Sequence, residues 1–242
     1  MNATNGRVKR FTIQSRFLKE ERGFWLYVPP HFDPEQHYPI LYAHDGNDYL
    51  NMGRIRTIVN ERTQAGTLQP IVIVGVPVEK GHRKAEYHPE GDRHQAYISF
   101  IVEELIPYVE GQDGIKIKAA ERATIGSSLG GVVGCQLAWT YPDMFQIVIS
   151  QSGAFYSPSM VKALDSVQHS NKTRHYFMVG NDESEVATAS GPINFLQANR
   201  ELMDLLEEKG IPFHYEEQKG GHTWGLWQKN LPEALAYFWQ KT

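Results

Sequence analysis

The chain has 242 residues, which suits one sizeable α/β domain, and no Pro-, Gly- or Ser-rich linker divides it, so we expect a single domain over residues 1–242. Its 24 Lys and Arg residues against 28 Asp and Glu give a formal net charge of -4. Because no basic excess is present to attract nucleic acid or anionic lipid, the composition indicates a small-molecule partner and leaves the oligomeric state open.

The N-terminal segment and the cysteine content bear on location. Residues 1–10 are polar, and no apolar run approaches the roughly 20 residues that a membrane helix needs. We therefore expect no membrane segment and a cytoplasmic protein. Cys135 is the only cysteine and cannot form an intrachain disulfide, which fits a reducing compartment. Its position predicts a small core residue rather than a reactive thiol.

Strand-like runs occur along the whole chain. They lie at residues 8–14, 24–28, 38–44, 71–76, 123–125, 145–149, 175–179 and 212–217. The first two are separated by the charged residues 19–23, which predicts an antiparallel pair with a turn there. The run at 71–76 is apolar on both faces, as expected of a central parallel strand.

Helical segments alternate with the later strands. They are expected at about residues 52–65, 96–109, 129–141, 194–209 and 232–240, whereas residues 77–93 are polar and loop-like. Strands that alternate with helices after an antiparallel start predict an α/β fold with a mostly parallel, doubly wound sheet and helices on both faces. The ligand loops of such a sheet lie at the carboxyl ends of its strands.

The centre of the sequence carries a nucleophile-elbow pattern. The segment Gly126-Ser127-Ser128-Leu129-Gly130 fits G-x-S-x-G between an apolar strand and a helical segment. The turn is so tight that side chains at the two glycines would clash with neighbouring backbone. Ser128 is therefore the predicted nucleophile, and the N–H of Leu129, at the positive end of the helix, is a predicted oxyanion donor. The alternative is that these small residues only cap a helix.

A serine hydroxyl needs a base within hydrogen-bond reach and a carboxylate to orient that base. Among the histidines, His222 is the best placed, because it follows the last predicted strand in a loop that begins Gly220-Gly221. The alternative is a surface histidine. The chain order Ser, acid, His is the one expected of an α/β-hydrolase.

The acid is expected from residues 180–183, which follow the preceding strand. Asp182 and Glu183 are both candidates that the residues alone do not separate, and Glu185 is a more remote one. The second oxyanion donor should be a backbone N–H in the loop after the third predicted strand, and we assign it to Asn47.

Several short motifs, spread over nearly the whole chain, are specific in their order and spacing. They are residues 25–30 (WLYVPP), residues 38–42 (YPILY), Asp45-Gly46, Arg83 with Glu86-Tyr87, residues 103–107 (EELIP), the elbow, residues 141–145 (YPDMF), residues 220–224 (GGHTW) and Trp227. In these motifs the chain resembles the putative esterase family of α/β-hydrolases. This family includes siderophore (enterochelin-type), feruloyl and acetyl-xylan esterases, S-formylglutathione hydrolase and the mycolyltransferases.

The resemblance implies an α/β-hydrolase fold without a catalytic metal or other cofactor. In the family the acid usually stands three residues after the glycine that ends its strand, which here favours Glu183 over Asp182. Members related to the siderophore esterases do not all depend strongly on this acid.

Other polar and aromatic residues could contribute to a site. A possible zinc cluster comprises His82, Glu86, His88, Glu90, Asp92 and His94. Its spacings match neither a helical face nor a compact loop motif, so we expect a polar loop and no metal. Candidates for contact with a polar leaving group, or for simple exposure, are Arg54, Arg83 and Tyr87. Candidates for an acyl or aryl wall, or for core packing, are Trp224, Trp227, Phe155 and Tyr156.

Together these features predict a serine carboxylic-ester hydrolase that works through an acyl-enzyme on a small or aryl ester, such as a siderophore-type, feruloyl or acetyl ester. Two alternatives remain: an acyltransferase of the same fold, and a non-catalytic binding protein on a hydrolase scaffold. The substrate-binding residues stay undefined.

Overall fold

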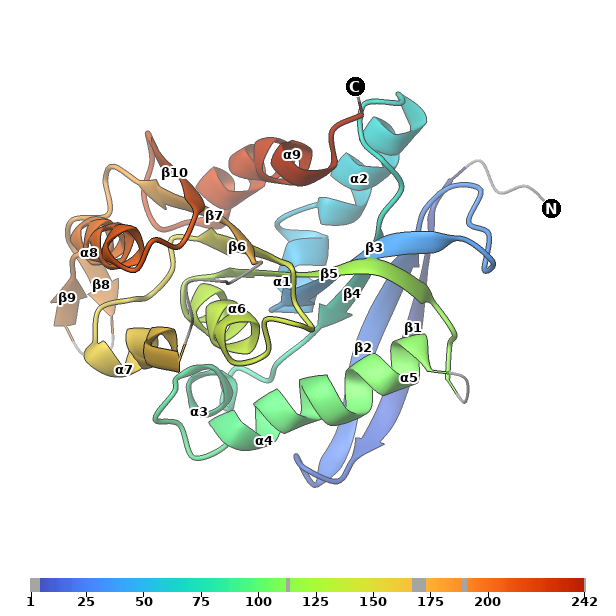
Figure 1. Cartoon of the computed structure of the whole chain (residues 1–242), viewed down its shortest axis with the longest axis horizontal. Helices are drawn as coiled ribbons and strands as arrows, with labels where there is room; N and C mark the ends of the chain where they lie inside the picture. The colour runs from blue at the N-terminus through green and yellow to red at the C-terminus, as the bar shows by residue number, and fades with distance from the viewer. Residues whose placement is uncertain (1–4, 112–113, 167–172, 189–190, 242) are drawn as a thin grey trace.

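A mostly parallel sheet of eight strands runs through the centre of the protein (Figure 1). The computed structural model describes residues 5–111, 114–166, 173–188 and 191–241, so residues 1–4 of the polar N-terminal segment lie outside the described residues. The strand order is β1-β2-β4-β3-β5-β6-β7-β10. β1 pairs antiparallel with β2, and β2 with β4, whereas all later pairs are parallel. The predicted doubly wound sheet with an antiparallel start is confirmed.

Each strand of the large sheet overlaps a predicted run, although β5 and β2 are longer than predicted. They are β1 (Arg7–Ser15), β2 (Glu20–Val28), β3 (His37–His44), β4 (Val72–Val76), β5 (Lys118–Ser127), β6 (Ile147–Gln151), β7 (Arg174–Gly180) and β10 (Phe213–Gln218). Every residue of β4 and β6 is buried, because helices cover both faces of these central strands. A separate antiparallel pair, β8 (Val186–Thr188) and β9 (Gly191–Ile193), has no counterpart among the predicted strands.

Helices form a layer on each face of the sheet (Figure 1). On one face lie α1 (Gly46–Asn51), α2 (Ile55–Gln64) and α9 (Trp224–Trp239). On the other lie α4 (His94–Ser99), the π-helical turn Phe100–Leu105, α5 (Ile106–Glu110), α6 (Leu129–Thr140) and α8 (Phe195–Glu208). The short helices α3 (Arg83–Tyr87) and α7 (Pro158–Val161) and the 3-10 turn Lys162–Ser166 connect these elements. The two layers bury separate apolar clusters, one against each face of the sheet.

The first hairpin and the helix after β3 differ from prediction. The charged segment expected to form the turn belongs largely to β2, because Glu20–Gly23 pair with the end of β1, and the turn falls at residues 16–19. The predicted helix 52–65 corresponds to α2 alone, whereas α1 precedes it in a segment where no helix was predicted. Gly53 separates the two helices, and an added Cβ there would lie 2.8 Å from the carbonyl oxygen of Tyr49.

Two further differences concern helices. The polar segment 77–93 contains α3, which sequence periodicity did not indicate because it is only five residues long. The last helix begins at Trp224 rather than at Pro232. A proline is typical of a first helical turn, but here the burial of Leu226, Trp227 and Leu231 on the sheet outweighs the lost backbone hydrogen bond. Among the described residues, no helix has the length and apolar character to cross a membrane.

The carboxyl ends of the parallel strands and the loops that follow them lie along one edge of the sheet. The residues that follow these ends closely are Asp45 after β3, Pro77 after β4, Ser128 after β5, Ser152 after β6, Glu183 after β7 and His222 after β10. Parallel strands bring such residues together although they are far apart in the sequence.

Candidate active site

Ser128 occupies the sharp turn between β5 and α6. Its φ of 55° and ψ of -124° are unusual for a residue with a side chain, and such conformations cost about 1–3 kcal/mol. Its N–H donates to the carbonyl of Gln151 at 3.0 Å, which fixes the turn to β6. A Cβ on Gly126 would overlap the backbone of Gly130, so this strand-to-helix passage needs glycine. Ser128 therefore stands at a strained, glycine-dependent turn from strand to helix.

Leu129 is the first residue of α6, so its N–H has no carbonyl partner within the helix. Asn47 stands in the first turn of α1, directly after β3, where the same argument applies to its N–H. Both predicted oxyanion donors therefore lie at helix N-termini next to strand ends at one edge of the sheet. A helix N-terminus favours negative charge.

His222 and Glu183 are hydrogen-bonded. The Nδ1 of His222 lies 2.7 Å from Oε2 of Glu183. An ionised carboxylate only accepts hydrogen bonds, so Nδ1 carries the proton and Nε2 is left as the basic nitrogen. The His222 ring packs against Phe195, with ring centroids 4.3 Å apart, and edge-on to Trp227 at 5.0 Å. These contacts hold the imidazole in one orientation.

Glu183 is fully buried and its second oxygen is also satisfied. Oε1 accepts from the Ser152 hydroxyl at 2.6 Å and from the N–H of Gly180 at 2.9 Å. The Ser152 oxygen in turn accepts from Nε1 of Trp227 at 2.9 Å. A buried carboxylate is costly unless its oxygens accept hydrogen bonds of this kind. The other two acid candidates, Asp182 and Glu185, are exposed, and the structure gives neither a contact with His222.

Ser128 and His222 line one cleft of about 270 Å³. Its other walls are Asp45, Asp48, Arg83, Ser127, Thr223, Trp224 and Trp227. Burial and the neighbouring carboxylate of Asp45 raise the pKa of Asp48 above its usual range. The cleft therefore combines two indole rings with charged groups.

Arg83 joins the loop after β3 to the elbow. Its Nε and Nη2 donate to the two carboxylate oxygens of Asp45 at 2.9 and 2.8 Å, and Nη2 also donates to the carbonyl of Ser127 at 3.2 Å. Burial disfavours the charge on Arg83, but the hydrogen bonds and charge of Asp45 prevail and raise its pKa. Tyr87 is fully buried and its hydroxyl accepts from the N–H of Asp45 at 2.9 Å. Tyr87 thus stabilises the loop after β3 through this hydrogen bond.

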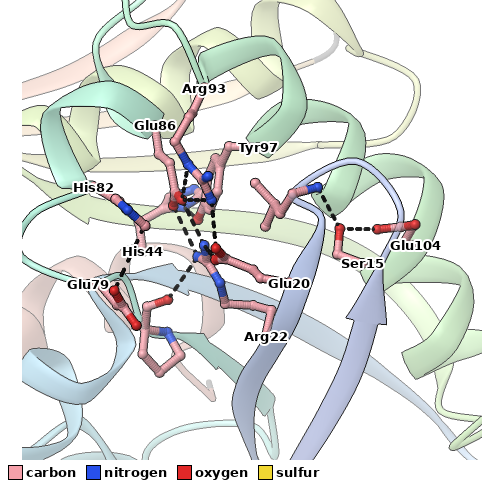
Figure 2. A network of polar contacts seen from close by, with 12 residues as sticks. Ser15, Glu20, Arg22, His44, Glu79, His82, Glu86, Arg93, Tyr97 and Glu104 are labelled. Carbon is pink, nitrogen blue, oxygen red and sulfur yellow. Dashed lines mark hydrogen bonds and ion pairs between the residues drawn. The ribbon is translucent and has the colours of Figure 1, made fainter.

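The histidines and carboxylates at 82–94, for which we expected a polar loop and no metal site, do not come together as one cluster. Only His82 and Glu86 come together, with Glu20 of β2, each offering one potential ligand atom within 4.8 Å of the others. Figure 2 shows that arginines occupy the same place. Arg22 donates to both oxygens of Glu86 at 3.0 and 2.7 Å, and Arg93 lies 3.2 Å from Glu86 and 3.0 Å from Glu20. Because two guanidinium groups neutralise these carboxylates, the cluster is an ion-pair network that joins β2 to α3 and α4.

The remaining candidates divide between the cleft and other surfaces. Trp224 and Trp227 line the cleft, whereas Phe155 and Tyr156 line a separate hollow beside α8. Arg54 is exposed and does not line the cleft.

Comparison with known proteins identifies the family. The model of the family described as "Putative esterase" matches residues 15–238. The chain belongs to this esterase family. The uncharacterized protein YjcH of Bacillus subtilis is 35% identical over 97% of this chain and 98% of its own. Membership of the esterase family supports ester hydrolysis as the reaction class.

Solved structures of esterases share the fold. A ferulic acid esterase matches with a TM-score of 0.79 at 20% identity, covering 96% of this chain and 97% of its own. The enterobactin esterase FES from Shigella flexneri matches with a TM-score of 0.79 at 20% identity over 95% of this chain, which spans only 58% of FES. The predicted α/β-hydrolase fold is confirmed.

Sequence reasoning missed several residues that shape the site. Ser152, Phe195 and Asp48 contact the candidate residues or line the cleft, but each stands in a segment with no catalytic pattern. Asp45 was noted only as part of a motif, and Arg83 as part of a motif and as a candidate for contact with a leaving group or for exposure. Their pairing joins positions 38 residues apart and needs the folded chain to be recognised.

Proposed function

We propose that the protein is a serine carboxylic-ester hydrolase with Ser128 as nucleophile, His222 as general base and Glu183 as the acid that orients it. One observation carries this proposal. Ser128 and His222 line the same cleft, and the buried carboxylate of Glu183 holds the histidine. Asp182 is exposed and stays the alternative acid.

In the proposed mechanism, the Ser128 hydroxyl attacks the ester carbonyl while Nε2 of His222 takes its proton. The N–H groups of Leu129 and Asn47 hold the negative oxygen of the tetrahedral intermediate. The alcohol leaves with the proton from His222, which forms an acyl-serine. Water then attacks the acyl group with His222 again as base, and the carboxylic acid departs.

The substrate we propose is a small or aryl ester. The two indole rings of Trp224 and Trp227 in the cleft support an apolar or aromatic part. The names of the structural neighbours, a ferulic acid esterase and an enterobactin esterase, favour the same class. We further propose that residues 1–242 form one domain that acts in the cytoplasm.

The test is hydrolysis of p-nitrophenyl acetate and butyrate, methyl ferulate, an acetylated sugar and a catecholate trilactone. Ser128→Ala should lose at least about 10³-fold in kcat. The matched control is Ser184→Ala, an exposed serine in the acid loop that should react like the unsubstituted protein. A fluorophosphonate should label Ser128 alone. Equal hydrolysis by Ser128→Ala would refute the mechanism, and acyl transfer to an added alcohol in preference to water would establish the transferase instead.

A further inference from the structure

One carboxylate of the cleft, that of Asp48, is left without a charged partner. Asp48 follows Asp45 by three positions, and its N–H donates to the carbonyl of Asp45 at 2.8 Å in the turn that brings both residues to the cleft. Arg83, the one arginine or lysine among the described lining residues, donates Nε and Nη2 to Asp45. Within the described part of the chain, the structure gives the Asp48 carboxylate no side-chain hydrogen bond and no ion pair. The cleft therefore has a surplus of negative charge.

The Asp48 side chain and the indole ring of Trp224 are both accessible from the cleft. Each of these residues is half-buried and lines the cleft. The Trp224 ring packs edge-on against Tyr49, the residue after Asp48, with ring centroids 4.9 Å apart. Trp227 stands nearly perpendicular to Trp224, with centroids 5.1 Å apart. A ligand in the cleft can thus contact an unpaired carboxylate and an indole ring at the same time.

The electrostatic surroundings of Asp48 favour a positive ligand. Burial and the charge of Asp45 raise the pKa of Asp48, and the charges of Arg83 and Lys80 only partly oppose this shift. The surroundings therefore do not fully compensate the ionised carboxylate. A cation in the cleft would compensate it, whereas an anion would increase the repulsion. The carboxylate that ester hydrolysis releases is such an anion, so the same surplus charge favours its departure.

We propose that the cleft selects small esters that carry an ammonium group near the ester bond, and that Asp48 and Trp224 recognise this cation. The carboxylate attracts the charge, and the faces of indole rings bind ammonium groups. A cleft of about 270 Å³ holds only a small molecule, so a few bonds separate the cation from the carbonyl at Ser128. The ammonium group belongs either to the alcohol, as in a choline ester, or to the acyl part, as in an amino-acid ester. This proposal rests on the ester hydrolysis proposed above.

Two pairs of esters isolate the effect of the charge. Choline acetate is compared with 3,3-dimethylbutyl acetate, in which carbon replaces the quaternary nitrogen. The methyl ester of β-alanine is compared with methyl butyrate, in which a methyl group replaces the ammonium. The members of each pair have nearly the same shape, so a difference between them reports on the charge alone.

Binding is measured first, by saturation-transfer NMR titration of the Ser128→Ala protein, and this arm requires no hydrolysis. The charged member of at least one pair should bind at least about fivefold more tightly than the neutral member. Asp48→Asn in the same protein should remove this preference, and Trp224→Leu should reduce it. The matched control is Glu79→Gln, which neutralises an exposed carboxylate outside the cleft and should keep the preference.

Kinetics of the protein with Ser128 intact then show which part of the ester carries the ammonium group. A higher kcat/KM for choline acetate than for 3,3-dimethylbutyl acetate places it in the alcohol, and a higher value for the β-alanine ester than for methyl butyrate places it in the acyl part. Asp48→Asn should lower the charged-to-neutral ratio of kcat/KM at least about fivefold, whereas Glu79→Gln should leave it unchanged. Circular dichroism confirms that each variant is folded.

The two arms separate this proposal from the esterase assignment. Equal binding of the charged and neutral members of both pairs overturns the proposal, even if the esters are hydrolysed. An equal charge preference in Asp48→Asn and Glu79→Gln also overturns it, because the cation is then attracted by other groups. A charge preference in binding that depends on Asp48, without hydrolysis of any ester, supports the cation site and refutes the esterase.

Discussion

The Ser152 hydroxyl lies 2.6 Å from Oε1 of Glu183, on the side of the carboxylate away from His222. Its oxygen also accepts from Trp227, so one serine links the acid to the aromatic wall of the cleft. Ser152→Ala should leave the carboxylate with one partner fewer and the histidine less well oriented. We expect kcat to fall about three- to tenfold with little change in KM.

A double-substitution cycle tests this linkage. Once Glu183→Gln has removed the carboxylate, Ser152→Ala should have no further effect on kcat. Independent, multiplicative losses from the two substitutions would show that Ser152 acts by another route.

Neutralising Glu183 should lower kcat much more than neutralising Asp182. Glu183→Gln removes the charge that stabilises protonated His222, so kcat should fall by at least about tenfold, although less than in Ser128→Ala. Asp182→Asn, at an exposed position, should stay within about twofold of the unsubstituted protein. The measurement is kcat on p-nitrophenyl acetate for both variants. The reverse ranking would transfer the role to Asp182.

Arg83 should position the loop after β3, which contains Asn47, the proposed second oxyanion donor. Arg83→Gln leaves the buried Asp45 carboxylate without its two charge-assisted hydrogen bonds and frees the carbonyl of Ser127. We expect kcat to fall about 10- to 100-fold with a smaller change in KM, because an oxyanion loop acts mainly on the transition state.

Two controls accompany that variant. Arg83→Lys keeps the charge but not the paired geometry and should recover only part of kcat. Arg54→Gln, at an exposed arginine outside the cleft, should leave the kinetics unchanged. A large rise in KM with constant kcat would instead make Arg83 a substrate-binding residue.

Two buried histidines should make the fold sensitive to acid. Burial, aided by the charge of Arg83, lowers the pKa of His44 to about 3, and burial lowers that of His175 to about 4. In the unfolded chain both titrate near 6.5, so below that pH the unfolded state binds more protons than the folded state. Stability should be complete above about pH 6.5 and decline as the pH falls toward 4.

The expected slope is about 1.4 kcal/mol per pH unit for each histidine in that window. Urea unfolding at several pH values gives this slope, and His175→Gln should reduce it by about half. A flat stability between pH 6.5 and 4.5 would mean that the two rings are protonated in the folded protein.

The sequence was sufficient for the fold class and for the position of the sharp turn that holds Ser128. Periodicity of apolar residues locates the central strands, because a strand covered on both faces must be apolar throughout, and the glycines of the elbow mark the tightest turn. These signals are local. The five-residue α3 and the β8–β9 pair were missed because they are too short to display a period.

Only the tertiary structure decided which groups meet. Asp182 and Glu183 are adjacent and chemically alike, and it is the path of the loop after β7 that buries one beside His222 and exposes the other. The pairing of Arg83 with Asp45 likewise joins elements that are distant in sequence. The periodicity of a strand or helix fixes the face on which a side chain lies, whereas burial and hydrogen bonding depend on what the rest of the chain places opposite that face.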